Sequence, residues 1–230
     1  DCLRFLAAMA VFLGHVSSLP FTNQLKWWHL NSYGDAAVII FFVLSGYVIS
    51  FVTHTREKTA RQYFSARAAR LYSVVGVCLL LTFILDYAGM RLRPDFYSIQ
   101  KVLWKPPSLS GYLSSIFFVN EYQAFSFGGI SPGSNAPYWS LSFEATYYAI
   151  AGLVLFGPTK YSLPAAFLIL YFAGRTISAL FPLWILGYCL FRAPPPPHFI
   201  RARFPTVILI TTGLLVLATD RQYQGPDRAG

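Results

Sequence analysis

The chain has 230 residues, of which 55% are hydrophobic and only 12% are charged, and its mean hydropathy is +0.49. A soluble domain carries about 25% charged residues because its surface must be hydrated. The composition therefore excludes an ordinary soluble domain and indicates an integral membrane protein. The net charge of +9 would suit nucleic-acid binding, but the basic residues lie between apolar segments. We therefore expect no nucleic-acid partner.

Apolar segments follow one another along the chain, separated by polar ones. Five are long enough, or nearly so, to cross a hydrocarbon core about 30 Å thick as helices. They are residues 3–19, 36–52, 71–87, 143–156 and 206–219, and two shorter apolar runs cover 163–173 and 181–191. None shows the alternation of a transmembrane β-strand. We predict an all-α transmembrane bundle of about seven helices, organised as one membrane domain over residues 1–230.

The basic residues set the expected orientation of this bundle. Residues 53–70 contain five Lys or Arg residues against one acidic residue, Glu57. The positive-inside rule places such a segment in the cytoplasm. The start of the first helix is then also cytoplasmic, and segment 88–138 lies outside. Within it, a loop as long as 97–138 is usually functional or packed against the domain. We expect a multi-pass protein of the inner (plasma) membrane, with the lipid bilayer as partner.

The sequence contains no pattern typical of a metal or nucleotide site. It has no CxxC, HExxH, Walker loop or GxGxxG, so we predict no metal ion and no tightly bound cofactor. Cys2, Cys78 and Cys189 are odd in number and lie in or beside apolar segments. A cysteine in that setting is usually a small buried hydrophobe, and we predict no disulfide framework.

Two ionisable residues, Arg4 and His15, lie within the first apolar segment. Placing such a residue inside a membrane costs about 2.5 to 3.5 kcal/mol, so it usually has a function. Their spacing of eleven residues puts both on one helix face, about 16 Å apart along the axis. From the residues alone, the simpler interpretation is that Arg4 reaches the headgroups and His15 bonds to a neighbouring helix.

Several motifs resemble one family of proteins. Asp1–Val16 (DCLRFLAAMAVFLGHV) is similar to the opening of the acyltransferase family 3 membrane proteins, whose first helix carries an Arg, ten intervening residues and a His. Four further segments resemble motifs of that family, in the same order along the chain. They are Gly34–Ser50 (GDAAVIIFFVLSGYVIS), Tyr63–Leu71 (YFSARAARL), Tyr138–Tyr148 (YWSLSFEATYY) and Phe181–Leu190 (FPLWILGYCL).

The chain also departs from the family. Cys2 stands where the family usually has Gly, and Ser73 stands where Pro is common. Family members have more helices than the apolar segments provide here. The resemblance therefore implies that the chain is truncated at its C-terminal end.

The resemblance implies an O-acyltransferase. Such an enzyme moves an acyl group, commonly acetyl, from cytoplasmic acyl-CoA to a hydroxyl of an extracytoplasmic glycan or lipid-linked acceptor. His15 is the expected general base, because neutral imidazole titrates near working pH. Arg4 is the second expected catalytic residue, either contacting the CoA phosphates or holding the thioester oxygen.

Further residues are candidates for substrate binding. Arg67 and Arg70 are three residues apart just before the third apolar segment, so their forked donors could clamp phosphate together, or they could serve only to orient the protein. Glu144 is expected at the outer start of a helix, where the helix dipole favours an acid, or it could orient an imidazole or bind an acceptor hydroxyl.

Three candidates have a packing explanation as well as a functional one. Trp139 is either an aromatic at the membrane interface or a platform for a sugar. Ser45 and Gly46 are small residues among large apolar ones. Close helix packing is the default explanation for them, and lining an acyl channel is the alternative.

Two other kinds of function also fit an apolar chain with buried Arg and His. One is a transporter whose charged residues line a solute path, although the sequence shows no paired halves or broken helices. The other is a non-catalytic membrane scaffold with the same fold.

Overall fold

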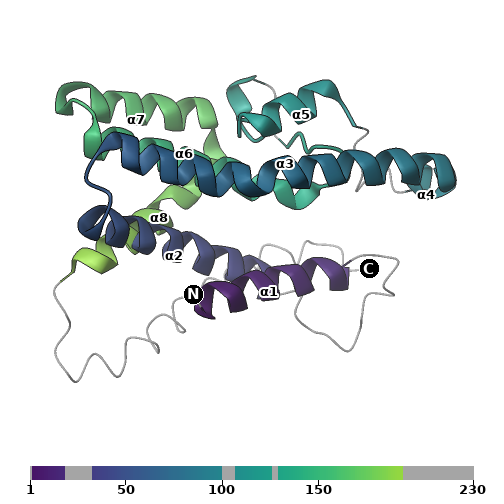
Figure 1. Ribbon diagram of the computed structural model, residues 1–230, viewed down its shortest axis with the longest axis horizontal. Coiled ribbons are helices and arrows are strands. Elements are labelled where there is room, and N and C mark those ends of the chain that lie inside the picture. The colour runs from purple at the N-terminus through teal and green to yellow at the C-terminus, as the bar shows by residue number, and fades with distance from the viewer. Residues whose placement is uncertain (1, 19–32, 100–106, 126–128, 194–230) are drawn as a thin grey trace, which may run out of the picture. The chain divides into compact units, whose positions relative to one another are not determined.

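The computed structural model describes residues 2–18, 33–99, 107–125 and 129–193, and every regular element in these ranges is helical (Figure 1). The helices are α1 (Cys2–Ser18), α2 (Tyr33–Thr55), α3 (Ala60–Leu92), α4 (Pro94–Ile99), α5 (Leu109–Ile116), η3 (Gln123–Phe125), η4 (Ala136–Tyr138), α6 (Trp139–Phe156), α7 (Thr159–Ala173) and α8 (Arg175–Arg192). The all-α prediction is confirmed for this part of the chain.

The predicted apolar segments coincide with helices wherever the structure describes them. Those at 3–19, 36–52, 71–87, 143–156, 163–173 and 181–191 fall almost wholly within α1, α2, α3, α6, α7 and α8. Segment 206–219 lies outside the described residues. Two helices, Ala37–Thr55 and Ala60–Leu92, are long and apolar enough to cross a membrane, and Phe5–Val16 is a shorter apolar helix. A bundle with more crossings than these two remains a prediction.

The third helix begins much earlier than the sequence analysis expected. Thr59 caps α3 with a capping box: its hydroxyl accepts a hydrogen bond from the Gln62 backbone N at 3.3 Å, and its own backbone N donates to the Gln62 side chain at 3.2 Å. These two bonds satisfy N–H groups that a helix start otherwise leaves unpaired. Arg67 and Arg70 therefore lie inside α3, and the prediction that they precede it was wrong.

Described parts of segment 97–138 pack against α3, one of the two expectations for so long a loop. The apolar patch at 116–119 follows α5, and the Ile116 carbonyl accepts a hydrogen bond from the Tyr72 hydroxyl of α3 at 3.1 Å. Phe118 is buried, with its ring centroid 5.3 Å from that of Tyr72. This packing covers one face of α3 with the segment that leads into α6.

By their internal contacts the residues form two compact units. The first unit contains Asp1–Phe51 and Leu183–Gly230, and the second contains Val52–Pro182. The single membrane domain expected from the sequence stays a prediction.

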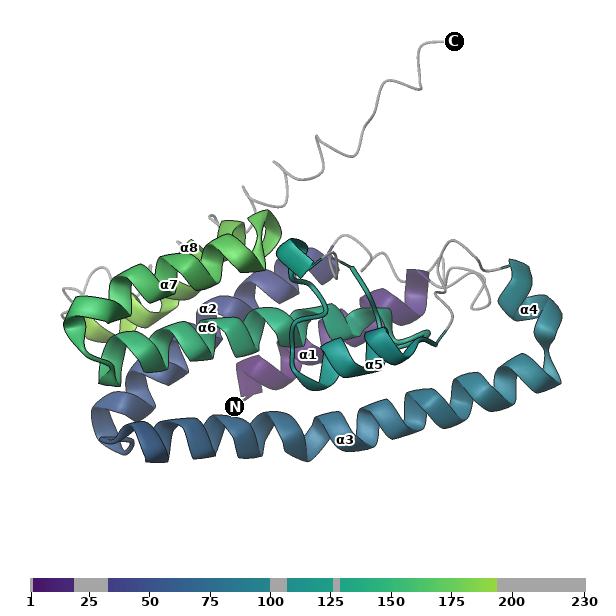
Figure 2. The ribbon, with the colours of Figure 1, turned by 90° about the horizontal axis from the view of Figure 1, so that it is seen from above.

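In the second unit, α6 lies between α3 and α7 (Figure 1 and Figure 2). Large residues fill its interior: Tyr63, Phe143 and Tyr147 are at most 1% exposed. The buried hydroxyl of Tyr147 donates to the carbonyl of Ile177 at 2.7 Å. Each buried phenol thus adds apolar area while its polar end is satisfied, and this core fixes the position of α6.

In the first unit, α2 and the end of α8 cross closely. An added Cβ on Gly46 would overlap the backbone carbonyl of Trp184, and one on Gly187 would overlap that of Val43. The Trp184 indole N–H donates to the Ser45 hydroxyl at 3.4 Å. Two motifs of the sequence, FFVLSG and the Leu-Gly pair of FPLWILGYCL, therefore meet at one helix crossing.

We expect Gly46→Ala or Gly187→Ala to destabilise the protein by about 1 to 3 kcal/mol, because overpacking against backbone cannot be relieved by a rotamer change. Gly76→Ala is the matched control, since its added Cβ would meet nothing within 4 Å and alanine favours a helix by up to about 1 kcal/mol. Heating in detergent, followed by measurement of the remaining monodisperse protein, gives the comparison. Equal behaviour of the Gly46 and Gly76 variants would contradict the close crossing.

Candidate active site

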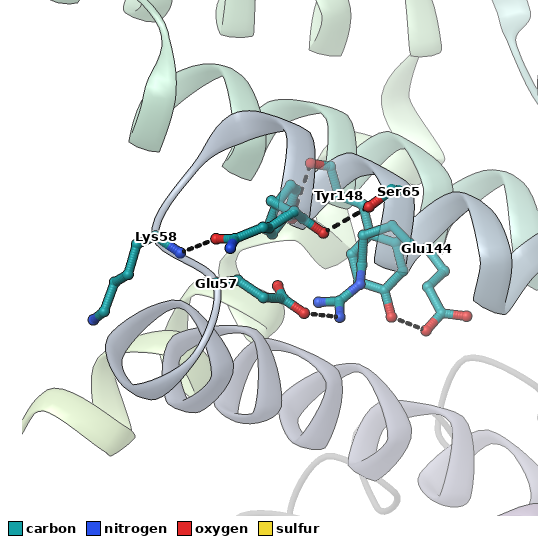
Figure 3. Close-up of polar contacts among 8 residues, drawn as sticks. Glu57, Lys58, Ser65, Glu144 and Tyr148 are labelled. Carbon is teal, nitrogen blue, oxygen red and sulfur yellow. Dashed lines mark hydrogen bonds and ion pairs between the residues drawn. The ribbon is translucent and has the colours of Figure 1, made fainter.

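Arg67 of α3 forms a mostly buried ion pair with Glu57, which lies between α2 and α3 (Figure 3). Its Nη2 is 2.7 Å from Glu57 Oε1, and the two side chains are 12% and 13% exposed. The guanidinium carbon lies 5.4 Å from the ring centroid of Tyr63 and 5.6 Å from that of Tyr148. Two aromatic rings and one carboxylate therefore hold this cation in place.

Arg70 pairs with a different carboxylate. Its Nη2 is 3.0 Å from Oε1 of Glu144 on α6. The Tyr148 hydroxyl donates to the same carboxylate oxygen (Figure 3). The Tyr63 hydroxyl donates to the Tyr148 carbonyl at 3.1 Å, so this part of α6 is tied to α3. We call Glu57, Arg67, Arg70, Glu144 and Tyr148 the ion-pair cluster.

The cluster corrects the expected position of Glu144. From the sequence, Arg70 was expected at the cytoplasmic edge and Glu144 at the outer start of a helix, but their ion pair puts them at one level. The reason is that α3 begins early and runs antiparallel to α6, so a residue well inside α3 meets the first half of α6. The first turn of α6 holds no acidic residue, which removes the helix-dipole explanation for Glu144.

The ion pair of Arg67 and Glu57 leaves polar atoms unused. Arg67 Nε and Glu57 Oε2 are both buried and have no hydrogen-bond partner among the described residues. Buried polar atoms of this kind are usually satisfied by a water or a ligand. The Arg70 side chain, at 36% exposed, is the more accessible cation. The cluster therefore combines two unsatisfied buried polar atoms with one partly exposed cation.

The candidates of the first unit have different surroundings. His15 lies on an exposed part of α1, whereas Arg4 belongs to α1 but its side chain is outside the described residues. Ser45 is 2% exposed and bonded to Trp184, and Gly46 lies in the helix crossing. His15 and the ion-pair cluster belong to different units, so their catalytic cooperation stays a prediction.

Trp139 begins α6 and is half-buried. Its ring lies edge-on to Phe143, with the centroids 5.0 Å apart and the planes at 78°. This contact fixes the indole against the core of the second unit, and part of its surface stays accessible.

Three residues of interest were missed by the sequence analysis as site residues. Glu57 was counted only as the lone acid of a basic segment, and Tyr148 only as part of a motif. Asp86 lies in the predicted helix 71–87 and is 1% exposed. The rule that singled out Arg4 and His15, an ionisable residue within an apolar segment, would also have found Asp86.

Comparison with known proteins gives consistent matches. Residues 1–220 match the family described as "Acyltransferase domain". An O-acetyl transferase of Shigella phage Sf6 is 28% identical over 162 residues, covering 67% of this chain and 45% of that protein. The exopolysaccharide production protein ExoZ of Rhizobium meliloti (strain 1021) is 32% identical over 157 residues, covering 66% of this chain and 45% of that protein.

A third relative, the acyltransferase MdmB of Streptomyces mycarofaciens, is 24% identical over 161 residues, which are 64% of this chain and 36% of that protein. The chain thus matches less than half the length of each of these relatives. No solved structure matches the chain significantly. Because the family match runs from residue 1 to residue 220, the chain belongs to acyltransferase family 3, the family that its motifs resemble.

Proposed function

We propose that the protein is an integral membrane O-acyltransferase that moves an acetyl group from cytoplasmic acyl-CoA to a hydroxyl of an extracytoplasmic glycan. The observation that carries this proposal is the family match over residues 1–220. The relatives support the finer statement, because one is named an O-acetyl transferase and another an exopolysaccharide production protein. Acyl-CoA serves as donor substrate, and no tightly bound cofactor is required.

His15 acts as the general base in this proposal. Its neutral imidazole takes the proton of the acceptor hydroxyl while the hydroxyl oxygen attacks the thioester carbonyl. The C–S bond then breaks, and CoA leaves as a thiolate that takes up a proton. General-base catalysis of this kind typically contributes about 10²- to 10⁴-fold. Arg4, on the same helix, assists by contacting the CoA phosphates or the thioester oxygen.

Arg67 and Arg70 bind the polyanionic donor in this proposal. Each arginine already has a carboxylate partner, so a phosphate exchanges with a carboxylate rather than entering an empty clamp. Arg70 is the better first contact because it is the more exposed of the two. Glu144, held by Arg70, supports the site or receives an acceptor hydroxyl.

The remaining candidates serve the acceptor and the acyl chain. Trp139 offers a partly accessible aromatic face for a sugar ring. Ser45 and Gly46 belong to a close helix crossing, and their proposed role is to shape the wall of the acyl path. The bilayer is the partner of the apolar helices, and the proposed location is the inner membrane with several crossings.

Sealed vesicles of known orientation that carry the full-length protein test this function. Radiolabelled acetyl-CoA is placed on one side, and surface polysaccharide prepared from the producing cells is placed on the other. We expect labelled polysaccharide only when acetyl-CoA is on the side that exposes residues 56–59, since those residues belong to the basic cytoplasmic segment. No transfer in any arrangement would refute the acyltransferase. Transfer only with both substrates on one side would refute the crossing of the membrane.

A further inference from the structure

A second buried polar cluster lies near the other end of α3, and it centres on Asp86. This carboxylate is 1% exposed, and its Oδ2 accepts a hydrogen bond from the Ser134 backbone N at 2.9 Å. The Tyr97 hydroxyl of α4 lies 3.5 Å from its Oδ1. A buried carboxylate is costly unless it is hydrogen-bonded, so the contact with Ser134 is a strong one.

Two further residues of α3, Cys78 and Thr82, contact Asn135, the residue that follows Ser134. The Asn135 side-chain amide donates to the Thr82 hydroxyl at 3.1 Å and also lies 3.1 Å from the sulfur of Cys78, a free thiol. Residues 78, 82 and 86 are four apart, so they form one stripe along the helix. This stripe binds residues 133–135, which we call the docked segment.

The shape of the docked segment fits the carboxylate closely. Gly133 has φ +60°, a conformation that favours glycine, and an added Cβ would overlap Asp86 Oδ2. Burial and the nearby charge of Asp86 raise the pKa of both Tyr97 and Tyr112. The docked segment and α3 are therefore complementary in shape as well as in hydrogen bonding.

The docked segment leads directly into η4 and α6. Two other bonds fix the same stretch: the Tyr138 hydroxyl donates to the Ser115 carbonyl at 2.9 Å, and the Ser142 hydroxyl donates to Asn120 at 2.6 Å. The start of α6 is thus held at several points. The bonds to Asp86, Thr82 and Cys78 join the docked segment, just before η4 and α6, to α3, the helix that carries Arg70.

We propose that Asp86 is a positioning residue for acyl transfer: by holding the docked segment on α3 it sets the register of α6, and so keeps Glu144 opposite Arg70. The inference rests on the proposed function for its effect on catalysis. Asp86 and Arg70 are sixteen residues apart on α3, about 24 Å along the axis. Asp86 therefore acts through α6, without contact with the ion-pair cluster.

The test uses the native thiol beside the docked segment. Asp86→Ala is expected to lower kcat about tenfold to hundredfold, with a smaller change in KM, because a small misplacement of catalytic groups is costly. Asn135→Cys places a second thiol next to Cys78. In the Asp86→Ala, Asn135→Cys protein, oxidation to the disulfide is expected to restore at least half of the lost rate, and reduction is expected to abolish the gain.

Controls separate positioning from a general loss of folding. Asp95→Ala removes an exposed aspartate, 71% accessible, and is expected to leave kcat unchanged. Gly133→Ala is expected to lower kcat as Asp86→Ala does, because the added methyl group would overlap Asp86 Oδ2 and displace its hydrogen bond with the Ser134 backbone N. A disulfide that forms but restores nothing would overturn the proposal, as would an unchanged kcat in Asp86→Ala.

A readout independent of activity keeps this inference distinct from the proposed function. The rate of disulfide formation between Cys78 and the thiol introduced by Asn135→Cys is measured by mass spectrometry, with and without Asp86→Ala. We expect the substitution to slow the reaction at least fivefold, because the docked segment is no longer held. If the protein shows no acyl transfer, the proposed function fails while this rate still decides whether Asp86 holds the segment. An unchanged rate would overturn that role.

Discussion

Replacing His15 with alanine is expected to lower acyl transfer by about 10²- to 10⁴-fold while membrane insertion stays intact. Imidazole is the side chain that titrates closest to working pH, and an unactivated hydroxyl needs a base at its point of attack. His15 is exposed on α1, so its removal leaves no cavity in the core. The measurement is initial rate with radiolabelled acetyl-CoA in membranes containing equal amounts of full-length protein.

His54→Ala is the matched control for this experiment. His54 is also an exposed histidine on a helix, in the last turn of α2. Its backbone carbonyl accepts the hydrogen bond from Lys58, and this bond does not require the imidazole. We expect the His54 variant to keep its rate. Normal turnover in correctly inserted His15→Ala protein would remove His15 from the mechanism.

Breaking the ion pair between Arg67 and Glu57 is expected to have the largest effect on stability. In the Arg67→Met protein, the mostly buried carboxylate of Glu57 has lost its counterion. In the Glu57→Gln protein, the mostly buried guanidinium of Arg67 has lost its counterion. Removal of one partner of a buried pair typically costs about 3 to 5 kcal/mol. Each single variant should therefore lose monodisperse protein at a clearly lower temperature than the unchanged protein in detergent.

The double variant, with both Arg67→Met and Glu57→Gln, distinguishes a paired effect from two independent ones. It leaves no unpaired charge, so its loss should be smaller than the sum of the single losses by about 0.5 to 3 kcal/mol. Additive losses would mean that the two side chains do not stabilise one another. Arg93 and Asp95 offer an exposed pair for comparison, 74% and 71% accessible, and such a pair contributes about 1 kcal/mol or less.

Helix positions were predictable because they depend on local sequence. The apolar segments, including the two shorter ones, correspond to α1, α2, α3, α6, α7 and α8 wherever the structure describes them. Even the early start of α3 could have been found, since Thr59 and Gln62 have the spacing of a capping box. The expectation of a basic loop missed it because charge and not capping was used to set the boundary.

The partners of the site residues were not predictable in the same way. Arg70 and Glu144 are 74 positions apart, and their contact depends on how far α6 slides along α3. That register is set by long-range contacts such as the one between Asp86 and Ser134. Hydrophobic periodicity indicates which face of a helix is apolar, but it does not determine how far one helix is shifted along another.

Helix α3 has 33 residues, about 50 Å of helix against a hydrocarbon core of about 30 Å. Two of its charged side chains that contact other parts of the second unit, Arg70 and Asp86, are separated by an apolar stretch of fifteen residues, 71–85, or about 22 Å. In the proposed membrane arrangement, α3 is longer than the hydrocarbon core, and such a helix tilts or extends into the headgroup region. About 20 Å of α3 would then lie at or beyond the membrane surface, or be accommodated by tilt.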